Sequence, residues 1–335
     1  MPATRYTASM TGRATRINWL LFGLLGLIWG SSYLFIKIGV DAIGPFSLVT
    51  LRCVFAALFL AAVVRATGAR LSRRRSTIGH LAVLGVLSIF VPFVLIAWAE
   101  LHVITGLAAV LNATTPLFTI LMAPLVLRDE PLRLNRVVGL LVGFAGVAVV
   151  TAPTFAEGPS ADPLAFPAQV AIAVAAASYA LGAVYARRFV PDEKPTVISL
   201  GMVSFGALLT APLAFALDHP LTTGLPPEAL FASVWLGVLG SGVALIIFYR
   251  LLAAWGATRT HVVVYLLPPV GVAIGVIVLH EPLHVALVIG TTLIIGGAAL
   301  TNARLERGRP PRVARTSDAA PTTIPTATAA EDRAI

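Results

Sequence analysis

Charged side chains are scarce in this sequence: Asp, Glu, Lys and Arg make up 12% of its 335 residues, about half their share in an average soluble domain. Hydrophobic residues make up 58%. A helix that crosses a bilayer needs about 20 mostly apolar residues, and runs of this length recur from Ile17 almost to Ala303. The shortage of charge therefore excludes a water-soluble globular protein and predicts an all-α integral membrane protein.

Cysteine is almost absent as well. The single Cys53 lies inside an apolar run, which excludes an intrachain disulfide and a metal site built from thiolates. The 6 histidines fall near the ends of apolar runs or between them, and no pair has a third ligand at a spacing typical of a metal site. We therefore expect neither a metal nor another cofactor.

Acidic residues are missing from the middle of every apolar run, since all 15 lie towards the ends or outside. An integral membrane enzyme would need paired carboxylates, a metal cluster or an activated nucleophile at one face of the membrane, and the sequence contains no such set. A proton-coupled carrier often has a carboxylate within the membrane, and Glu100, at the end of the third run, is the nearest candidate. Proton antiport, facilitated exchange and uniport all stay open.

The apolar runs predict ten transmembrane helices. Their approximate bounds are 17–38, 46–64, 80–99, 103–127, 134–152, 168–186, 196–216, 230–249, 260–280 and 284–302. The predicted organisation is a tail at 1–16, a five-helix unit at 17–152, an external linker at 153–167, a second five-helix unit at 168–303 and a disordered tail at 304–335.

The basic residues predict the orientation of these helices. Lys37 and Arg52 lie within predicted helices, and every other Lys and Arg lies in a tail or in a loop on the N-terminal side of the membrane. Cytoplasmic loops are enriched in Lys and Arg, so we expect both termini in the cytoplasm. The formal net charge of +9 then reflects topology, and the expected partner is the lipid bilayer and not a nucleic acid.

One motif recurs in register in the two halves. The first copy is Glu130-Pro131-Leu132 with Gly139 and Gly146, and the second is Glu281-Pro282-Leu283 with Gly290 and Gly297. Because each half has an odd number of helices, the second copy enters the membrane from the opposite side. The sequence thus predicts two inverted five-helix repeats, an arrangement suited to alternating access.

The motifs of the first half resemble a known family. The residues that carry the resemblance are Trp29-Gly30-Ser31-Ser32, Lys37, Pro45, Arg52, Pro116 and Glu130-Pro131-Leu132. They are similar to the EamA domain of the drug/metabolite transporter superfamily, and both copies together cover roughly 17–303. The second half lacks the Trp-Gly pair and counterparts of Lys37 and Arg52. The resemblance implies a ten-helix carrier with a central cavity, usually an exporter of amino acids or other metabolites.

Arg52 is the charge placed most deeply in a predicted helix, about two turns from its outer end. An arginine at such a depth usually faces protein or water. One interpretation is an anion site, for instance for a substrate carboxylate, helped by Lys37. The other is a structural pair with Asp41 or Glu100, or extension of the side chain to the outer interface.

A second cluster lies midway along the fourth predicted helix, where Asn112, Thr114 and Thr115 precede Pro116. Polar groups beside a proline often line a cavity, because the freed carbonyls need partners, but they also bond to neighbouring helices. The complete set of candidate substrate-pathway residues is Trp29, Ser32, Lys37, Arg52, Trp98, Asn112, Thr115, Tyr179, Ser241 and Tyr265.

We interpret the chain as a multi-pass secondary transporter of the plasma membrane that exports a small molecule. Between 196 and 303 the only basic residues are Arg250 and Arg259, both at predicted helix ends. This disfavours phosphorylated substrates and favours a neutral, zwitterionic or cationic solute such as an amino acid or a drug. The alternatives are an integral membrane enzyme and a membrane scaffold that transports nothing, and the oligomeric state is open.

Overall fold

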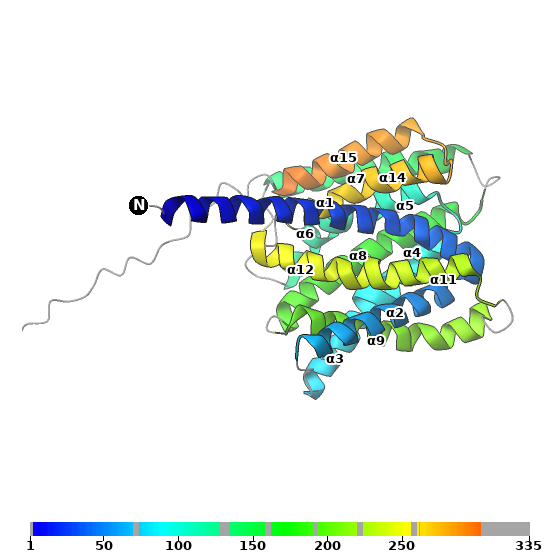
Figure 1. Ribbon diagram of the computed structural model, residues 1–335. Coiled ribbons are helices and arrows are strands. Elements are labelled where there is room, and N and C mark those ends of the chain that lie inside the picture. The colour runs from blue at the N-terminus through cyan, green and yellow to red at the C-terminus, as the bar shows by residue number, and fades with distance from the viewer. Residues whose placement is uncertain are drawn as a thin grey trace, which may run out of the picture.

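The computed structural model describes residues 3–69, 74–126, 134–157, 162–190, 193–219, 224–255, 260 and 262–302. The predicted tail at 304–335 and the first Glu-Pro-Leu copy at 130–132 lie outside these ranges. Within them the fold is a bundle of helices without strands (Figure 1).

The first half of the bundle contains long helices, and two of its helical stretches are interrupted or irregular. Its elements are α1 (Ala3–Ile43), α2 (Pro45–Ala66), α3 (Arg75–Gly85), η1 (Val86–Phe90), α4 (Val91–Ala99), α5 (Thr105–Asn112), α6 (Thr115–Val126) and α7 (Leu134–Glu157). The second half contains α8 (Ala165–Phe189), α9 (Pro195–Leu213), η2 (Ala214–Asp218), α11 (Pro227–Val234), η3 (Trp235–Val243), α12 (Ala244–Trp255), η4 (Val262–Leu266), α14 (Leu267–Val278) and α15 (Val285–Asn302).

Eight of these helical stretches are long and apolar enough to cross a membrane. They are Arg16–Ile43, Pro45–Ala66, Arg75–Ala99, Thr105–Met122, Leu134–Pro153, Ala165–Phe189, Pro195–Asp218 and Pro227–Phe248. Two shorter apolar helices, Val263–Val278 and Val285–Leu300, complete the bundle. Large apolar side chains such as Leu141, Ile277 and Val285 are about 70% exposed, as expected where lipid replaces water. The protein is therefore a multi-pass integral membrane protein.

The helices extend beyond the predicted apolar runs at several ends. Helix α1 begins at Ala3 within the predicted tail, and α7 continues through Pro153 to Glu157 in the predicted linker. Hydropathy reports only the part of a helix that fits the bilayer, whereas the backbone hydrogen bonds of a helix continue into polar flanking residues. At these ends the predicted boundaries therefore fall inside the helices.

Irregular turns occur at matching places in the two halves. The turn η1 in the third stretch and η3 in the eighth are π-helical. The fourth stretch breaks at Ala113 before Pro116, and the ninth begins with the 3₁₀ turn η4 before Pro268. Proline lacks the N–H that the preceding turn needs, and π turns within α-helices are frequent at functional sites. The middle of the bundle therefore has irregular backbone in four stretches.

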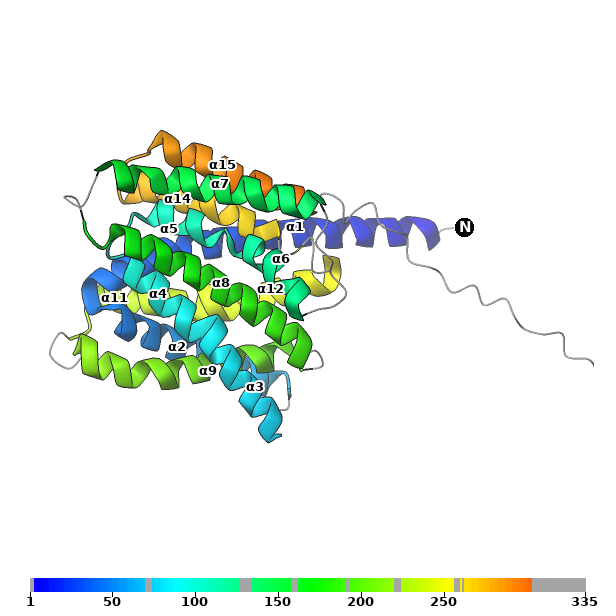
Figure 2. The ribbon, with the colours of Figure 1, turned by 180° about the vertical axis from the view of Figure 1, so that it is seen from behind.

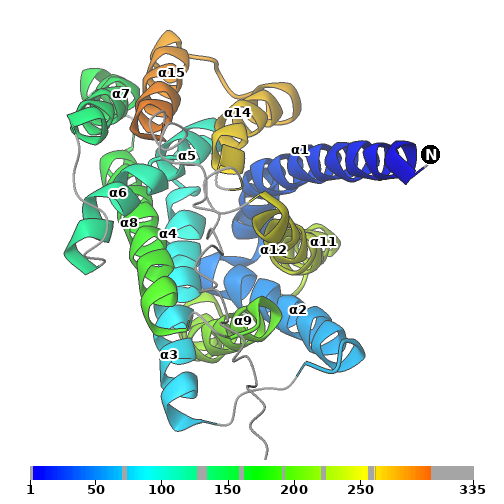
Figure 3. The ribbon, with the colours of Figure 1, turned by 90° about the vertical axis from the view of Figure 1, so that its left-hand side faces the viewer.

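Three helices of the first half pack against the helices at the equivalent positions of the second half. Helix α2 contacts α9, α5 contacts α14, and α7 contacts α15. Seen along the bundle, α2 with α9 and α7 with α15 lie at opposite sides (Figure 3). From behind, α8 runs beside α4 and α6 (Figure 2).

The glycines of the repeated motif bring α7 and α15 into close contact. A Cβ atom placed on Gly297 would lie 2.5 Å from the carbonyl oxygen of Gly139, and one placed on Gly146 would lie 2.7 Å from that of Gly290. Small residues at such crossings let helix backbones approach in a membrane. The glycines of the repeated motif therefore form the contact between the fifth and tenth stretches.

Helix α1 begins and α15 ends at one end of the bundle (Figure 1). We call the other end, where α1 turns into α2 at Gly44 with φ of 79°, the Gly44 end.

Two carboxylates of the second half cap helices of the first half at the Gly44 end. The backbone N–H of Ser47 donates to Asp218 Oδ2 (2.6 Å), and those of Thr105 and Gly106 donate to Glu281 (2.7 and 3.1 Å). Carboxylates are favourable at helix N-termini, so these contacts hold the two halves together at the Gly44 end.

Candidate functional site

The buried side chain of Arg52 on α2 is the centre of the candidate site. Its guanidinium carbon lies 3.7 Å from the centre of the Phe93 ring, and its Nε donates a hydrogen bond to Ser241 Oγ (3.1 Å). Within the described ranges no carboxylate lies at ion-pair distance from Arg52. A cation over an aromatic face is stabilised by the ring quadrupole, but its charge is not neutralised by this contact.

This geometry bears on the two interpretations of Arg52. Asp41 pairs with Lys37 (3.1 Å) and not with Arg52. Arg52 is also only 8% exposed, so its side chain does not extend to an interface. What remains is a buried cation held by a hydroxyl group and a ring, which is the arrangement that an anionic group could complete.

Gly240 on η3 is the point at which several predicted pathway residues meet. Its carbonyl oxygen accepts a hydrogen bond from Trp29 Nε1 (3.1 Å). A Cβ atom at Gly240 would lie 3.2 Å from Ser32 Oγ and 3.9 Å from Arg52 Nη2. With Ser241 next to it, the π turn thus brings together four predicted residues, from α1, α2 and η3.

Asn112 and Tyr33 form a second polar group nearby. Asn112 Nδ2 donates to the Tyr33 hydroxyl (2.7 Å), and Thr115 Oγ1 donates to the Asn112 carbonyl (2.7 Å), which lies at the break before Pro116. The buried Asn112 Oδ1 has no hydrogen-bond partner among the described residues. A buried acceptor without a hydrogen bond costs free energy. A donor group of a bound molecule could remove this cost by bonding to Oδ1.

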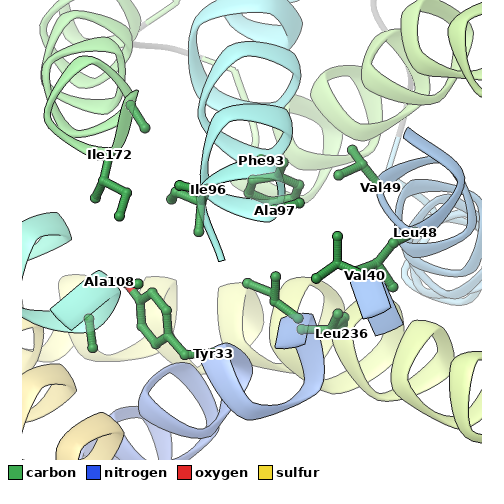
Figure 4. Close-up of a cluster of buried hydrophobic side chains, with 14 of the residues drawn as sticks. Tyr33, Val40, Leu48, Val49, Phe93, Ile96, Ala97, Ala108, Ile172 and Leu236 are labelled. Carbon is green, nitrogen blue, oxygen red and sulfur yellow. The ribbon is translucent and has the colours of Figure 1, made fainter. Parts of the chain in front are cut away.

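Aromatic rings connect these groups. Tyr33 points from α1 towards α5, and Phe93 projects from α4 into the middle of the bundle (Figure 4). Tyr179 of α8 lies edge-on to Phe93 with ring centres 6.4 Å apart. Trp29, Ser32, Arg52, Asn112, Thr115, Tyr179 and Ser241 therefore lie in or next to this central site.

Three predicted residues lie elsewhere. Lys37 Nζ bonds Asp41 and the Glu100 carbonyl (2.9 Å) near the Gly44 end. The Trp98 ring lies against His102, with centres 5.1 Å apart. Tyr265 packs against a separate apolar cluster formed by Leu117, Leu140 and Ala298. These positions place the three outside the group around Arg52.

Neither Phe93 nor Tyr33 is among the site residues predicted from the sequence. An aromatic residue in an apolar helix gives no signal by itself, because most such rings only pack. The neighbouring Pro92, which follows the π turn η1, was the one available indication that this part of the helix is irregular.

A pocket of about 440 Å³ opens near the Gly44 end. It is lined by Lys37, Ile38, Asp41, Leu101, His102, Val103, Ile104, Leu279 and Glu281. Near it, His102 Nδ1 lies 2.9 Å from Asp162 Oδ2. The backbone N–H of Leu164 and the bond to His102 hold the pKa of Asp162 below its ordinary value. The pocket wall itself carries charges of both signs, from Lys37 on the one hand and Asp41 and Glu281 on the other.

Comparison with known proteins assigns the fold. The profile of the EamA-like transporter family matches residues 17–152 and 167–303. A crystal structure of a protein that is 24% identical superimposes with a TM-score of 0.62 over 87% of this chain and 98% of that chain. No group of three or more metal-ligating side chains occurs in the described part of this chain.

Several curated relatives carry transporter names. An "Uncharacterized transporter" of Archaeoglobus fulgidus is 24% identical over 84% of this chain and 96% of its own. A "Probable terminal-alkyne amino-acid exporter" of Streptantibioticus cattleyicolor is 26% identical over 87% and 95%. The "Uncharacterized inner membrane transporter YedA" of Escherichia coli K12 is 28% identical over 76% and 81%. These names indicate transporters and not enzymes. With both halves matched by the family profile, the chain belongs to the EamA-like transporter family.

Proposed function

We propose that this protein is a secondary transporter of the plasma membrane that exports amino acids or related zwitterionic metabolites by alternating access. The observation that carries the proposal is the buried Arg52, which has a ring and a hydroxyl as partners but no carboxylate among the described residues. A substrate carboxylate would supply the missing charge. Arginine is well suited to this because its planar donors match a carboxylate with two parallel hydrogen bonds.

The second polar group supplies the other half of an amino-acid site. Asn112 Oδ1 is a buried acceptor without a partner in the described chain, and a substrate ammonium group is a strong donor. Phe93 and the partly buried Tyr179 offer apolar surface to a substrate side chain. The name of the Streptantibioticus relative, an amino-acid exporter, agrees with a substrate of this class.

The mechanism needs ten membrane crossings arranged as two inverted five-helix repeats. Pairwise contacts between corresponding helices, α2 with α9, α5 with α14 and α7 with α15, support an internal two-fold relation. The matching irregular turns in the third and eighth stretches support it further. In such a fold, exchanging the conformations of the two halves converts an outward-open state into an inward-open one.

The proposed orientation puts both termini in the cytoplasm and the Gly44 end outside. Replacement of Cys53 by alanine gives a cysteine-free background, into which Ser76→Cys or Glu228→Cys is introduced. Both positions are exposed. A membrane-impermeant maleimide applied to intact cells is expected to label Glu228→Cys and not Ser76→Cys, and permeabilisation should add labelling of Ser76→Cys. The reverse pattern would contradict the orientation.

Transport itself is tested by counterflow in proteoliposomes. The vesicles are loaded with one unlabelled amino acid, and uptake of the same radiolabelled compound is followed for a panel of alanine, phenylalanine, threonine, lysine, glutamate and propargylglycine. We expect uptake above protein-free vesicles for at least one zwitterionic member. If correctly folded protein moves none of them, the proposed substrate class is wrong.

A further inference from the structure

The side chain of Glu100 is unusual in this bundle. It directly follows α4 at the Gly44 end, it is 0% exposed, and neither of its carboxyl oxygens has a hydrogen-bond partner among the described residues. Transferring an ionised carboxylate into such surroundings without a partner is very costly, whereas the protonated form costs far less. Glu100 therefore fits this conformation as a neutral carboxylic acid.

The charged groups around Glu100 do not replace the missing partners. From α1, Lys37 Nζ bonds the backbone carbonyl of Glu100 (2.9 Å) and the carboxylate of Asp41, so its bonds do not reach the Glu100 carboxyl group. The carboxylate of Glu281, which follows α14, accepts hydrogen bonds from the backbone N–H groups of Thr105 and Gly106. Asp41 and Glu281 act on Glu100 as like charges, while Lys37 and Arg52 act as opposite charges, and Tyr33 also interacts with it electrostatically. No group among these holds an ionised Glu100 in place.

Glu100 lies next to the route by which water could enter. Residues 101–104 and Lys37 line the pocket of about 440 Å³, and Glu100 lies just behind this wall. The bonds from Thr105 and Gly106 to Glu281 join the two halves at this point. Separation of the halves at the Gly44 end would break these bonds and admit water to the carboxyl group.

Helix α4 connects Glu100 to the central site. Phe93, which packs on the Arg52 guanidinium, precedes Glu100 by two helical turns, so both lie on the same face of the helix, about 10 Å apart. A movement of α4 that changes the surroundings of Phe93 therefore also changes those of Glu100.

On these grounds we infer that Glu100 is the proton-binding group that couples substrate movement to proton movement. The inference rests on the proposed transport function. When the Gly44 end is open, the carboxylate exchanges a proton with water, forming an O–H bond. When this end closes, the group is buried as in this structure and stays in the neutral form. When the opposite end opens instead, water from that side reaches the group, the O–H bond breaks, and the proton is released to that side of the membrane.

The test uses the full-length protein in vesicles that contain a pH-sensitive dye. Substrate counterflow is measured in parallel with the amino acids of the panel above. For wild type we expect proton movement that depends on an added transported amino acid. Glu100→Gln, which keeps the size and neutrality of the protonated side chain, is expected to lose this proton signal completely while amino-acid counterflow continues. Asp41→Asn, a matched change at the rim of the same pocket, should retain both signals.

A second measurement does not depend on transport. Infrared difference spectra of the detergent-purified protein over a pH series should contain the C=O band of a titrating, buried carboxylic acid, and Glu100→Gln should remove that band. The inference is overturned if the band persists in Glu100→Gln, or if adding a transported amino acid on one side of the vesicles moves no protons in a wild type that is active in counterflow. If wild type exchanges no amino acid of the panel, the result contradicts the proposed function, and the coupling inference, which rests on it, is then also wrong.

Discussion

Replacement of Arg52 by alanine is expected to reduce amino-acid counterflow by about tenfold to a hundredfold. A hydrogen bond to a charged group contributes about 1.5–3 kcal/mol, which corresponds to this range at about 1.4 kcal/mol per tenfold change. The loss should appear mainly as weaker binding, because Arg52 is proposed to hold the substrate carboxylate in the resting complex. Initial rates of counterflow over a range of substrate concentrations measure it.

Two variants serve as controls for this result. Lys37→Ala removes a cation that is already paired with Asp41 and lies away from the central site, so its effect should be much smaller. Arg52→Lys keeps the charge but loses the planar set of donors, and we expect an intermediate rate. If wild type and Arg52→Ala give the same flux, Arg52 is not an anion site.

The second large effect is expected at the crossing of α7 and α15. In Gly297→Ala, the new Cβ atom would lie 2.5 Å from both the carbonyl oxygen of Gly139 and the backbone nitrogen of Gly143. Backbone cannot move aside as a flexible side chain can, so the helices must separate, and overpacking of this kind costs about 1–3 kcal/mol. Thermal unfolding of the detergent-purified protein should show a clearly lowered midpoint.

The neighbouring glycine provides a matched control. A Cβ atom on Gly296 would meet nothing within 4 Å, and the position is exposed on the outside of α15. Alanine is also a better helix former than glycine by about 1 kcal/mol. Gly296→Ala should therefore unfold at the wild-type midpoint or slightly above it. Equal destabilisation of both variants would contradict a specific role of the close crossing at Gly297, because helix propensity alone favours alanine at both positions.

Most of the helices were predictable because their signal is local. A run of about 20 apolar residues has few alternatives to a membrane helix, and every predicted run overlaps a helix of the structure. The helix ends at Ala3 and Glu157 were not predictable in this way, since polar residues that continue a helix do not differ in hydropathy from those of a loop. The π turns η1 and η3 also left no sequence signal beyond the proline or glycines beside them.

The central site was only partly predictable, for a different reason. A single arginine within an apolar helix stands out, so Arg52 was identified at once. Its contacts with Phe93 and Ser241 join α2 to α4 and η3, and no sequence pattern reports contacts between distant helices. Tyr265 is one of the predicted pathway residues, and the structure places it against an apolar cluster that is separate from the one containing Tyr33 and Phe93. Its proposed role in the pathway stays a prediction.

The central claim is that one site, around Arg52, is reached alternately from the two sides of the membrane. Ser32 is suited to test it, because it lies beside Gly240 in this site and, among the described residues, its hydroxyl bonds only to the Ile28 carbonyl of its own helix (2.9 Å). Ser32→Cys is introduced into the Cys53→Ala protein and reconstituted in vesicles in a single orientation. A small, impermeant methanethiosulfonate is then applied from outside or from inside.

We predict that the cysteine at position 32 reacts from both sides, and that a transported amino acid slows both reactions. Slowing on both sides would mean that the substrate occupies the same site in both states. Reaction from one side only, or reaction that no transported amino acid slows, would contradict alternating access to a site at Arg52.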